Sequence, residues 1–534
     1  MNKCGRWMER KKRVVPGEIC TERPEKGKRD HRKKIALNVQ KSAEAICTGN
    51  GKGRINKGQS TLRKEDNAMK AEYTGNGGCL QRDSTECKEY AGARNVVPPE
   101  REEMAGREPD LLEKVLDRDN LNRAYKRVKA NKGAPGVDGM TVEEALPWLK
   151  EHGKELTDSI LQGKYKPDPV RRKEIPKPDG GVRKLGIPSV KDRIVQQGIA
   201  QVLTPIYEPL FTDGSYGYRP GKSAQDAIRR ILEYGKQGYE WAVLLDLSKY
   251  FDTLNHEKLL NLLRREIHDE RVIQLIKRFL KSGVMENGVV MPTEEGSPQG
   301  GPLSPLLANI YLNEFDHEYE RRGVPVIRYA DDIVILCKSE RAAERLLESS
   351  IRYLEDRLKL KVNRDKSHIA KLNATKKFKF LGFAFGKSKD GLFIRVHKKV
   401  LAKAKDKLRD LTKRNQGRNV REVMAKAKLF LRGWLNYYGI AEMKNTMKEW
   451  DGWLRRRFRM YIWKQWKKPR TKCRNLLKLG MPEKYAKMAA MSRRGYWFMA
   501  GVSTVERAIS NERLARAGYY SILEAYESIH SVKC

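Results

Sequence analysis

The sequence predicts an α+β fold in which an antiparallel sheet with helices on one face is followed by a mainly helical, strongly basic domain. Short apolar runs suited to strands alternate with stretches of helical spacing from about residue 110 onward. The strand signals stop near residue 395, and most of the remaining chain has helical spacing. Charge divides the chain in the same way, because residues 201–350 carry a net charge of −4 and residues 401–500 carry +21.

The size and charge of the chain restrict its partners. It has 534 residues, enough for roughly three or four domains. Lys and Arg number 110 against 68 Asp and Glu, a formal net charge of +42. Because neutralising phosphates releases condensed counterions, this excess predicts a polyanionic partner. The alternative is a basic protein whose charge serves only solubility, and the uneven placement of the charge argues against it.

The cysteines and the hydropathy pattern indicate in which cellular compartment the protein is expected. The eight cysteines include no C-x-x-C pair, and no Cys/His cluster has zinc spacing. A disulfide framework is therefore not expected, which favours a reducing compartment. No run of about 18 apolar residues suggests a membrane span. The N-terminus lacks the apolar core of a secretory signal. We therefore expect a cytoplasmic protein.

The first 240 residues are expected to run from a disordered tail into regular structure. Residues 1–100 are polar and carry a net charge of +10, so they are predicted to be a disordered basic tail, either a passive extension or a loose RNA-binding arm. Asp119 is the expected N-cap of a helix over residues 121–130. Two short strands around a Pro-Asp-Gly-Gly turn predict a hairpin over residues 174–187. Residues 192–207 have helical spacing.

The central part of the chain is predicted to form the sheet. Residues 242–247 read as a short apolar strand that ends at Asp246. Residues 326–336 read as two apolar strands that meet at Asp331 and Asp332, so the acids are expected at the tip of a hairpin. The intervening helices are expected over residues 255–279 and 305–321, and later helices over 400–414 and 421–438.

Three acids on these apolar strands indicate a metal site. Asp331 and Asp332 are adjacent like charges in an apolar hairpin, and burying them without a partner is costly. Asp246 also ends an apolar run that has no basic residue. Mg²⁺ prefers a few carboxylates together with phosphates and water. Three carboxylates on neighbouring strands are therefore predicted to hold two divalent ions for phosphoryl chemistry. The alternative is that each acid caps a turn.

An ordered series of motifs resembles a known family. Tyr329-Ala-Asp-Asp332 is similar to the Y-x-D-D box of reverse transcriptases, and Asp246-Leu-Ser-Lys-Tyr-Phe-Asp252 is similar to their first metal motif. The resemblance continues, in the family's order, through residues 215–224, 296–305 and 380–383. Residues 431–438 and 450–457 resemble the maturase region of bacterial group II intron-encoded proteins. The whole resemblance spans about residues 110–500.

The resemblance implies a right-hand polymerase and gives names to its parts. It implies an RNA-directed DNA polymerase that also binds its parent intron RNA to assist splicing and mobility. The expected partners are that RNA, an RNA template with a DNA primer, deoxynucleoside triphosphates and target DNA. The expected domains are a disordered basic tail over 1–100, an N-terminal extension with fingers over 101–240, a palm over 241–385, a helical thumb over 386–445, and a maturase domain with the C-terminal segment over 446–534.

The resemblance also implies roles for individual residues. Asp246, Asp331 and Asp332 match the acids that bind two Mg²⁺ ions, with Mn²⁺ as a substitute. Lys366 matches a lysine placed to protonate the leaving pyrophosphate, and its alternative role is a surface charge. Four further residues match nucleotide-binding positions: Lys177 and Arg183 at the triphosphate, Phe251 against the sugar 2′-position, and Gln299 beside template and nucleotide. Core packing is the alternative for Phe251, and a solvated strand face for the two cations.

The basic C-terminal half is predicted to bind RNA. Residues 453–474 alternate aromatic and cationic side chains, and residues 451–500 carry 15 basic against 2 acidic residues. Cations hold phosphates while rings stack on bases or pack in the core. The alternative is a charged helix face, although such faces usually mix signs. The RNA-binding candidates are Arg455, Arg456, Arg457, Lys464, Lys467 and Lys468.

Three other classes of protein remain as alternatives. The first is a splicing cofactor with an idle polymerase site, against which the three intact acids argue. The second is the reverse transcriptase of a retron or a diversity-generating element, against which the region around Trp434 and Trp463 argues. The third is an RNA-dependent RNA polymerase, against which Phe251 argues. The family often ends in an endonuclease domain with Cys pairs and His, and the resemblance is to members without it, since only His530 and Cys534 follow Cys473.

Overall fold

A computed structural model describes residues 110–176, 181–286, 288–297 and 300–531. All of them belong to one compact unit, residues 59–534. The predicted tail over 1–100, Lys177 and Gln299 lie outside the described residues.

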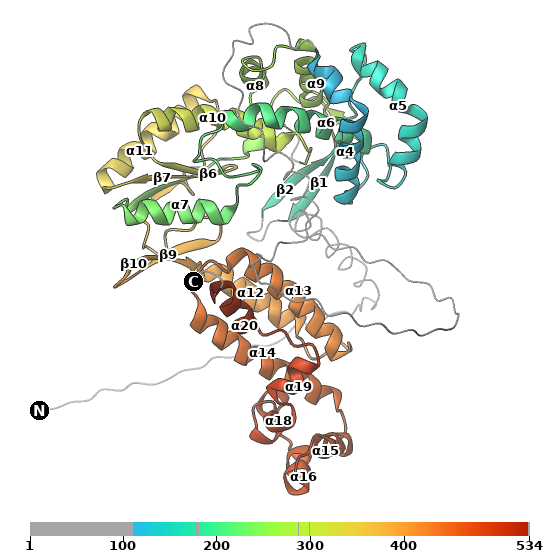
Figure 1. Cartoon of the computed structure of the whole chain (residues 1–534), viewed down its shortest axis with the longest axis vertical. Coiled ribbons are helices and arrows are strands. Elements are labelled where there is room, and N and C mark those ends of the chain that lie inside the picture. Colours follow the sequence, from blue (N-terminus) through green and yellow to red (C-terminus); the bar gives the residue numbers. More distant parts are fainter. Residues whose placement is uncertain (1–109, 177–180, 287, 298–299, 532–534) are drawn as a thin grey trace, which may run out of the picture. The chain divides into compact units, whose positions relative to one another are not determined.

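The described residues form a mixed α and β structure, which confirms the predicted α+β class (Figure 1). The strands are β1 (Val170–Pro176), β2 (Val182–Ile187), β3 (Trp241–Asp246), β4 (Val284–Glu286), β5 (Val289–Met291), β6 (Val326–Tyr329), β7 (Asp332–Cys337), β8 (His368–Lys371), β9 (Phe383–Ser388) and β10 (Gly391–Val396). The helices that accompany the first eight strands are α3 (Leu111–Leu116), α4 (Arg118–Ala130), α5 (Ala145–Leu161), α6 (Val190–Tyr207), α7 (Ala224–Lys236), α8 (His256–Leu263), α9 (Glu270–Leu280), α10 (Ser304–Arg321) and α11 (Glu340–Arg352).

Every element described after β10 is a helix, as the sequence predicted. These helices are α12 (Lys398–Leu411), α13 (Val420–Tyr438), α14 (Lys444–Gln465), α15 (Pro469–Lys478), α16 (Glu483–Met491), α17 (Tyr496–Met499), α18 (Ser503–Ala508), α19 (Asn511–Arg516) and α20 (Ile522–Ser531). None of the helices in the described ranges is long and apolar enough to cross a membrane.

The central sheet has the strand order β6-β7-β3-β8, and every pair in it is antiparallel. Because side chains alternate along a strand, each strand contributes to two cores. Val243 and Ile335 pack with α10 and α11 on one face, whereas Leu244 and Val334 pack with α7 on the other. Figure 1 shows α10 and α11 on one side of this sheet and α7 on the opposite side. The second core continues without a break into the C-terminal helices through Leu431 and Leu454.

A second sheet, with the order β2-β1-β4-β5, contains the hairpin predicted over residues 174–187. β1 and β2 pair antiparallel from Arg171–Ile187 to Pro176–Val182, and β1 pairs parallel with β4. Ser189 follows β2 and caps α6 by accepting a hydrogen bond from the Asp192 N–H. The predicted hairpin and the predicted helix over 192–207 are therefore confirmed.

Two local predictions were wrong. The N-cap of α4 is Asp117, whose carboxylate accepts from the N–H groups of Asp119 and Asn120, because α4 begins at Arg118 rather than at Leu121. The predicted continuous helix over 255–279 is two helices, since the chain leaves helical geometry after Leu263 and Asp269 caps the start of α9. The predicted domain boundaries at residues 385 and 445 lie in β9 and in α14, and the division into domains stays a prediction.

Candidate active site

The register of the central sheet brings two of the three predicted acids together. Asp246 is the last residue of β3 and Asp332 is the first of β7, and their Cα atoms are direct partners in the antiparallel pairing. Side chains of such partners project from the same face of a sheet. Asp331 precedes Asp332 in the β6–β7 turn, where Ala330 takes a left-handed backbone conformation with φ of 57°. The acids are thus at the tip of the hairpin, as predicted.

Electrostatics at this tip favour a bound cation. The pKa of Asp332 is raised to about 6, first by desolvation and then by the charges of Asp331 and Asp246. The pKa of Asp331 is also raised by desolvation, and Asp246 adds to that effect. Arg183 on β2 and Lys379 act in the opposite direction on Asp331 and Asp332 respectively. A divalent cation between the carboxylates would remove the repulsion that raises these pKa values.

The carboxylates at the tip can supply only part of the ligand shell of a divalent cation. Within the described ranges, no three His, Cys, Asp or Glu side chains lie close enough to hold a metal ion by themselves. Mg²⁺ in phosphoryl-transfer sites is held by one or two carboxylates together with water and substrate phosphates. Carboxylates from two adjacent strands, such as Asp246 and Asp332, supply the protein's share of such a shell.

A buried arginine supports the turn that carries the acids. The Arg328 side chain on β6 is fully buried and forms an ion pair with buried Asp316 of α10, with an N–O distance of 2.5 Å. The same guanidinium donates to the Asn309 side chain at 2.8 Å, to Ser215 Oγ at 2.7 Å and to the Ala330 carbonyl at 3.2 Å. Arg328 thus connects the turn to α10 and to the segment at Ser215. No sequence pattern indicated this network, because its members are distant in the chain.

Close backbone packing holds the same turn from the other side. A Cβ atom added to Gly217 would lie 2.2 Å from the Ala330 nitrogen, so only glycine allows the segment to approach the turn. The Asn309 side-chain amide donates to the Gly217 carbonyl at 2.7 Å. The motif over residues 215–224 therefore positions the acids by packing on the turn.

Lys366 lies beside the first acid. Its Nζ is 3.7 Å from Asp246 Oδ2, and both side chains are partly exposed. The backbone aligns the two residues, since the Asn363 N–H donates to the Asp246 carbonyl and the Asp246 N–H donates to Ser367 Oγ. The predicted acid–base lysine is thus within reach of a group bound at the acids.

Phe251 packs against the loop that carries Gln299. Its ring is half-buried, and its centroid is 5.4 Å from that of Tyr250. The Ser297 N–H donates to the Phe251 carbonyl at 2.6 Å. Gly300 closes the loop with φ of 138°, and a Cβ atom there would lie 2.3 Å from the Gly186 carbonyl of β2. Ser297 therefore contacts Phe251 and Gly300 packs closely on β2, whereas Gln299 lies outside the described residues.

His256 is a contributor to this site that the sequence motifs did not reveal. It is the first residue of α8, it is buried, and its Nε2 donates to the Gly296 carbonyl at 2.5 Å. The Gly296 N–H donates in turn to the Leu254 carbonyl. These bonds fix the start of the loop that continues to Gln299. The only sequence signal was a histidine four residues after Asp252, which is too weak to identify a role.

The cationic candidates on the β1–β2 hairpin differ in their surroundings. Arg183 is exposed on β2 and is close enough to lower the pKa of Asp331. Its neighbour Lys184 forms an ion pair with Glu286 of β4 at 3.4 Å. Lys177 lies outside the described residues. Lys379, which no sequence motif singled out, lowers the pKa of Asp332.

If Phe251 takes the position beside the sugar that the resemblance implies, Phe251→Ala is expected to raise ribonucleotide use relative to deoxynucleotide use roughly tenfold, because no ring would then collide with a 2′-hydroxyl. The measurement is the ratio of kcat/KM for a ribonucleotide to that for its deoxy counterpart in primer extension. Phe251→Tyr keeps the ring and should keep the ratio. A folded, active Phe251→Ala enzyme with an unchanged ratio would show that the ring serves packing alone.

The predicted RNA-binding cations fall into two groups. Arg455 pairs with buried Asp451, and Arg456 donates to the Trp497 carbonyl. Arg457 donates to Thr412 Oγ1 at 2.5 Å and to the Arg409 carbonyl at 3.0 Å. Lys464 lies over the Tyr496 ring, 4.9 Å from its centroid, whereas Lys467 and Lys468 are exposed. The contacts of Arg456, Arg457 and Lys464 link α14 to other segments, the Arg455 ion pair lies within α14, and Lys467 and Lys468 face solvent.

Several aromatic rings in and near residues 453–474 lie in the core. Trp463 is among the largest fully buried side chains and packs against Trp466. Trp450 is buried against Trp434. These rings therefore build the second core rather than offer stacking surfaces. His530, near the C-terminus, belongs to the same framework, with its Nε2 2.9 Å from the Gly439 carbonyl oxygen.

Comparison with known proteins agrees with this fold and site. Residues 175–385 match the family model of reverse transcriptases, or RNA-dependent DNA polymerases. Residues 401–480 match the maturase-specific domain of group II introns. The first range contains the two strands that carry Asp246 and Asp332. The chain is thus a polymerase of the reverse transcriptase class, which makes DNA on an RNA template, and such domains generally use divalent metal ions.

Two curated proteins and one solved structure are similar to parts of this chain. Protein YkfC of Escherichia coli is 36% identical over 312 residues, which are 51% of this chain and 81% of YkfC. The group II intron-encoded protein LtrA of Lactococcus lactis is 42% identical over 195 residues, which are 36% of this chain and 32% of LtrA. A chain of the partial Cas6-RT-Cas1--Cas2 complex is 26% identical at a TM-score of 0.31, over 46% of this chain and 42% of that chain. The protein belongs to the family of group II intron reverse transcriptases with a maturase domain.

Proposed function

We propose that Asp246, Asp331 and Asp332 hold two Mg²⁺ ions, for which Mn²⁺ can substitute, and that the site extends a DNA primer on an RNA template. Such ions activate the primer hydroxyl and neutralise the triphosphate. The pairing of Asp246 with Asp332 across β3 and β7 carries the proposal, and the raised pKa values of Asp331 and Asp332 support it. A bound cation would lower these pKa values, because it favours the ionised carboxylates.

The neighbouring side chains have complementary roles in this proposal. Arg183, with Lys177, binds the triphosphate and offsets its charge. Phe251 excludes a ribose 2′-hydroxyl, and Gln299 orients the deoxynucleotide on the template. The Lys366 ammonium, 3.7 Å from Asp246, donates a proton to the departing pyrophosphate oxygen. His256 acts through the loop at Gly296, so it is a positioning residue.

We further propose that the chain binds the RNA of its parent group II intron, and that this binding assists splicing and mobility into target DNA. The match of residues 401–480 to the maturase-specific domain supports this role. The net charge of +21 over residues 401–500 supplies the phosphate attraction. A bacterial cytoplasm is the proposed compartment, since intron transcript and target DNA meet there. The boundaries drawn at residues 100, 240, 385 and 445 remain our proposal for the division into tail, fingers, palm, thumb and maturase domain.

Exposed lysines test the RNA-binding role. Lys467→Gln/Lys468→Gln is expected to weaken binding of the parent intron RNA and to lower the log–log salt slope by about 0.7 to 0.9 for each phosphate that is no longer neutralised. Filter binding over a salt series measures both quantities. Primer extension at saturating primer-template should change much less, because the side chains that bind the nucleotide are unaltered.

The matched control is Glu449→Gln/Lys405→Gln, which removes an ion pair on α14 and α12 without changing net charge. Its salt slope should equal that of the wild type. Equal slopes and affinities for the lysine variant and the wild type would show that Lys467 and Lys468 are only a solvated face. Arg455, Arg456 and Arg457 are unsuitable for this test, since their replacement would also disturb interactions within the protein.

A further inference from the structure

Large exposed apolar side chains gather in one short part of the C-terminal region. Leu477, Tyr485, Met488, Met491, Trp497 and Phe498 are all exposed, and they lie within 22 consecutive residues. Met488 and Met491 retain 64% and 75% of their accessible surface. Single exposed apolar residues are ordinary, whereas a group of them marks an interaction surface. Most of this group lies beyond residue 480, where the match to the maturase-specific domain ends.

The exposed residues of α16 form one stripe. Tyr485, Met488 and Met491 follow each other at intervals of three, so they share a helix face. Ala486, Ala489 and Ala490 on the other face are buried against the neighbouring helices. Trp497 and Phe498 follow on α17, six and seven residues after Met491. We call Tyr485, Met488, Met491, Trp497 and Phe498 the α16–α17 surface.

Cations surround this surface and acids are scarce. Residues 471–500 contain seven Lys and Arg but one acid, Glu483, which pairs with Lys487. Lys484, Arg493 and Arg494 are exposed. The Arg494 guanidinium lies 4.4 Å from the Phe498 ring centroid, and Arg456 lies at the same distance from that of Trp497. Two of the exposed rings are therefore already paired with positive charge.

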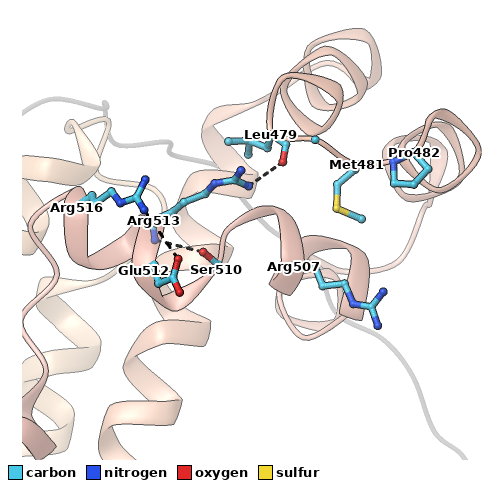
Figure 2. Close-up of a pocket in the computed structure, with 9 residues that line it drawn as sticks. Leu479, Met481, Pro482, Arg507, Ser510, Glu512, Arg513 and Arg516 are labelled. Atoms are coloured by element: carbon cyan, nitrogen blue, oxygen red, sulfur yellow. Dashed lines mark hydrogen bonds and ion pairs between the residues drawn. The ribbon is translucent and has the colours of Figure 1, made fainter.

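A basic hollow adjoins the start of α16. It has a volume of about 470 Å³, and its lining includes Met481 and Pro482, which lead directly into the helix. Figure 2 shows Arg513 and Arg516 at one end of the hollow and Arg507 near Met481 at the other. Arg513 donates to the Leu479 carbonyl, and Arg516 lies 4.0 Å from Glu512. Three arginines against one glutamate leave the hollow positive.

We propose that the α16–α17 surface and this hollow together bind a single-stranded segment of RNA. Exposed rings stack on unpaired bases while a neighbouring basic groove holds the phosphates, which is how proteins bind single strands. A second copy of the chain fits less well, because two surfaces lined with Lys and Arg would repel each other. The RNA backbone carries the charge that is opposite to these cations. RNA is favoured over DNA because α15, which packs on α16, lies within the matched maturase domain.

This inference rests on the proposed RNA-binding function and deepens it by naming the surface and the form of RNA. It differs from the role given to Lys467 and Lys468, since those lysines supply charge without an exposed ring. Variants can therefore weaken RNA binding at one of the two sites without weakening it at the other.

The test compares a 20-nucleotide RNA without self-complementarity with the duplex that it forms with its complement. Wild-type protein is expected to bind the single strand more tightly, because paired bases are not free to stack on protein rings. Tyr485→Ala/Met488→Ala/Phe498→Ala should weaken single-strand binding roughly fivefold or more and leave duplex binding unchanged. Arg507→Gln/Arg516→Gln should lower the single-strand salt slope by about 0.7 for each phosphate that the arginines no longer neutralise.

Two controls sharpen the test. Tyr485→Phe/Phe498→Tyr retains both rings and should bind as the wild type does. Leu161→Ala/Leu429→Ala removes exposed apolar side chains elsewhere and should change nothing. Circular dichroism shows that each variant is folded.

Four outcomes would overturn the inference: no preference of the wild type for the single strand, equal binding by the triple Ala variant, tighter binding of DNA of the same sequence, or a wild-type dimer that the triple variant dissociates. If intron RNA binding still depends on Lys467 and Lys468 in these cases, the proposed function stands without this surface.

Discussion

Asp331→Asn/Asp332→Asn is expected to lower primer extension by several orders of magnitude, because the described site offers only Asp246 as a remaining carboxylate on the central strands. Intron RNA binding should persist, since residues 401–500, which carry +21 of the net charge of +42, are unchanged. The variant should be at least as stable as the wild type. Desolvation, and then the charges of Asp331 and Asp246, raise the pKa of Asp332 to about 6, and the neutral amides remove both the buried charge and the repulsion. Single-nucleotide extension in Mg²⁺ and in Mn²⁺, together with a thermal melt, measures both effects.

The matched control is Glu344→Gln/Glu348→Gln. These exposed acids lie on α11, which packs on the face of the central sheet that carries Val243. The change removes the same number of negative charges, but from a helix that packs on the sheet. Primer extension should therefore stay near the wild-type rate. Near-normal extension by the Asn double variant would refute the assignment of the metal site. A lowered melting temperature for that variant would refute the electrostatic account.

Arg328→Met is expected to destabilise the protein by about 3–5 kcal/mol, because Asp316 would remain buried without its cation. Extension should also fall in the folded fraction, since Arg328 donates to the Ala330 carbonyl in the turn before Asp331. Urea unfolding followed by circular dichroism measures the first effect. Extension per folded molecule measures the second.

Two comparisons isolate the buried charge. Arg328→Met/Asp316→Leu removes both partners and should recover part of the lost stability, since replacing a buried pair with apolar side chains leaves no lone charge. Arg230→Met removes an exposed arginine of α7 that pairs with Glu233, and its cost should stay below about 1 kcal/mol. If Arg328→Met costs no more than Arg230→Met, the network does not hold the turn.

The sequence alone was sufficient for features that depend on local pattern. A strand that ends at Asp246 and a hairpin with Asp331 at its tip are encoded in runs of six to eleven residues, because the alternation of apolar side chains and the position of an acid are local properties. The Y-x-D-D box and the ordered motifs pointed to the reverse transcriptase class for the same reason. The helical character of the chain after residue 396 was also readable from spacing.

Only the tertiary structure showed which side chains are exposed and which are buried or paired within the protein. Arg455 and Lys467 look equivalent in the sequence, yet one pairs with buried Asp451 and the other is exposed. The sequence left stacking and core packing open for the rings of this region, and the structure places Trp463 in the core and leaves Trp497 exposed. Arg328 meets Ser215, 113 residues earlier in the chain. The burial of a side chain and its interaction partners depend on how distant segments pack. A short window of sequence does not determine that packing.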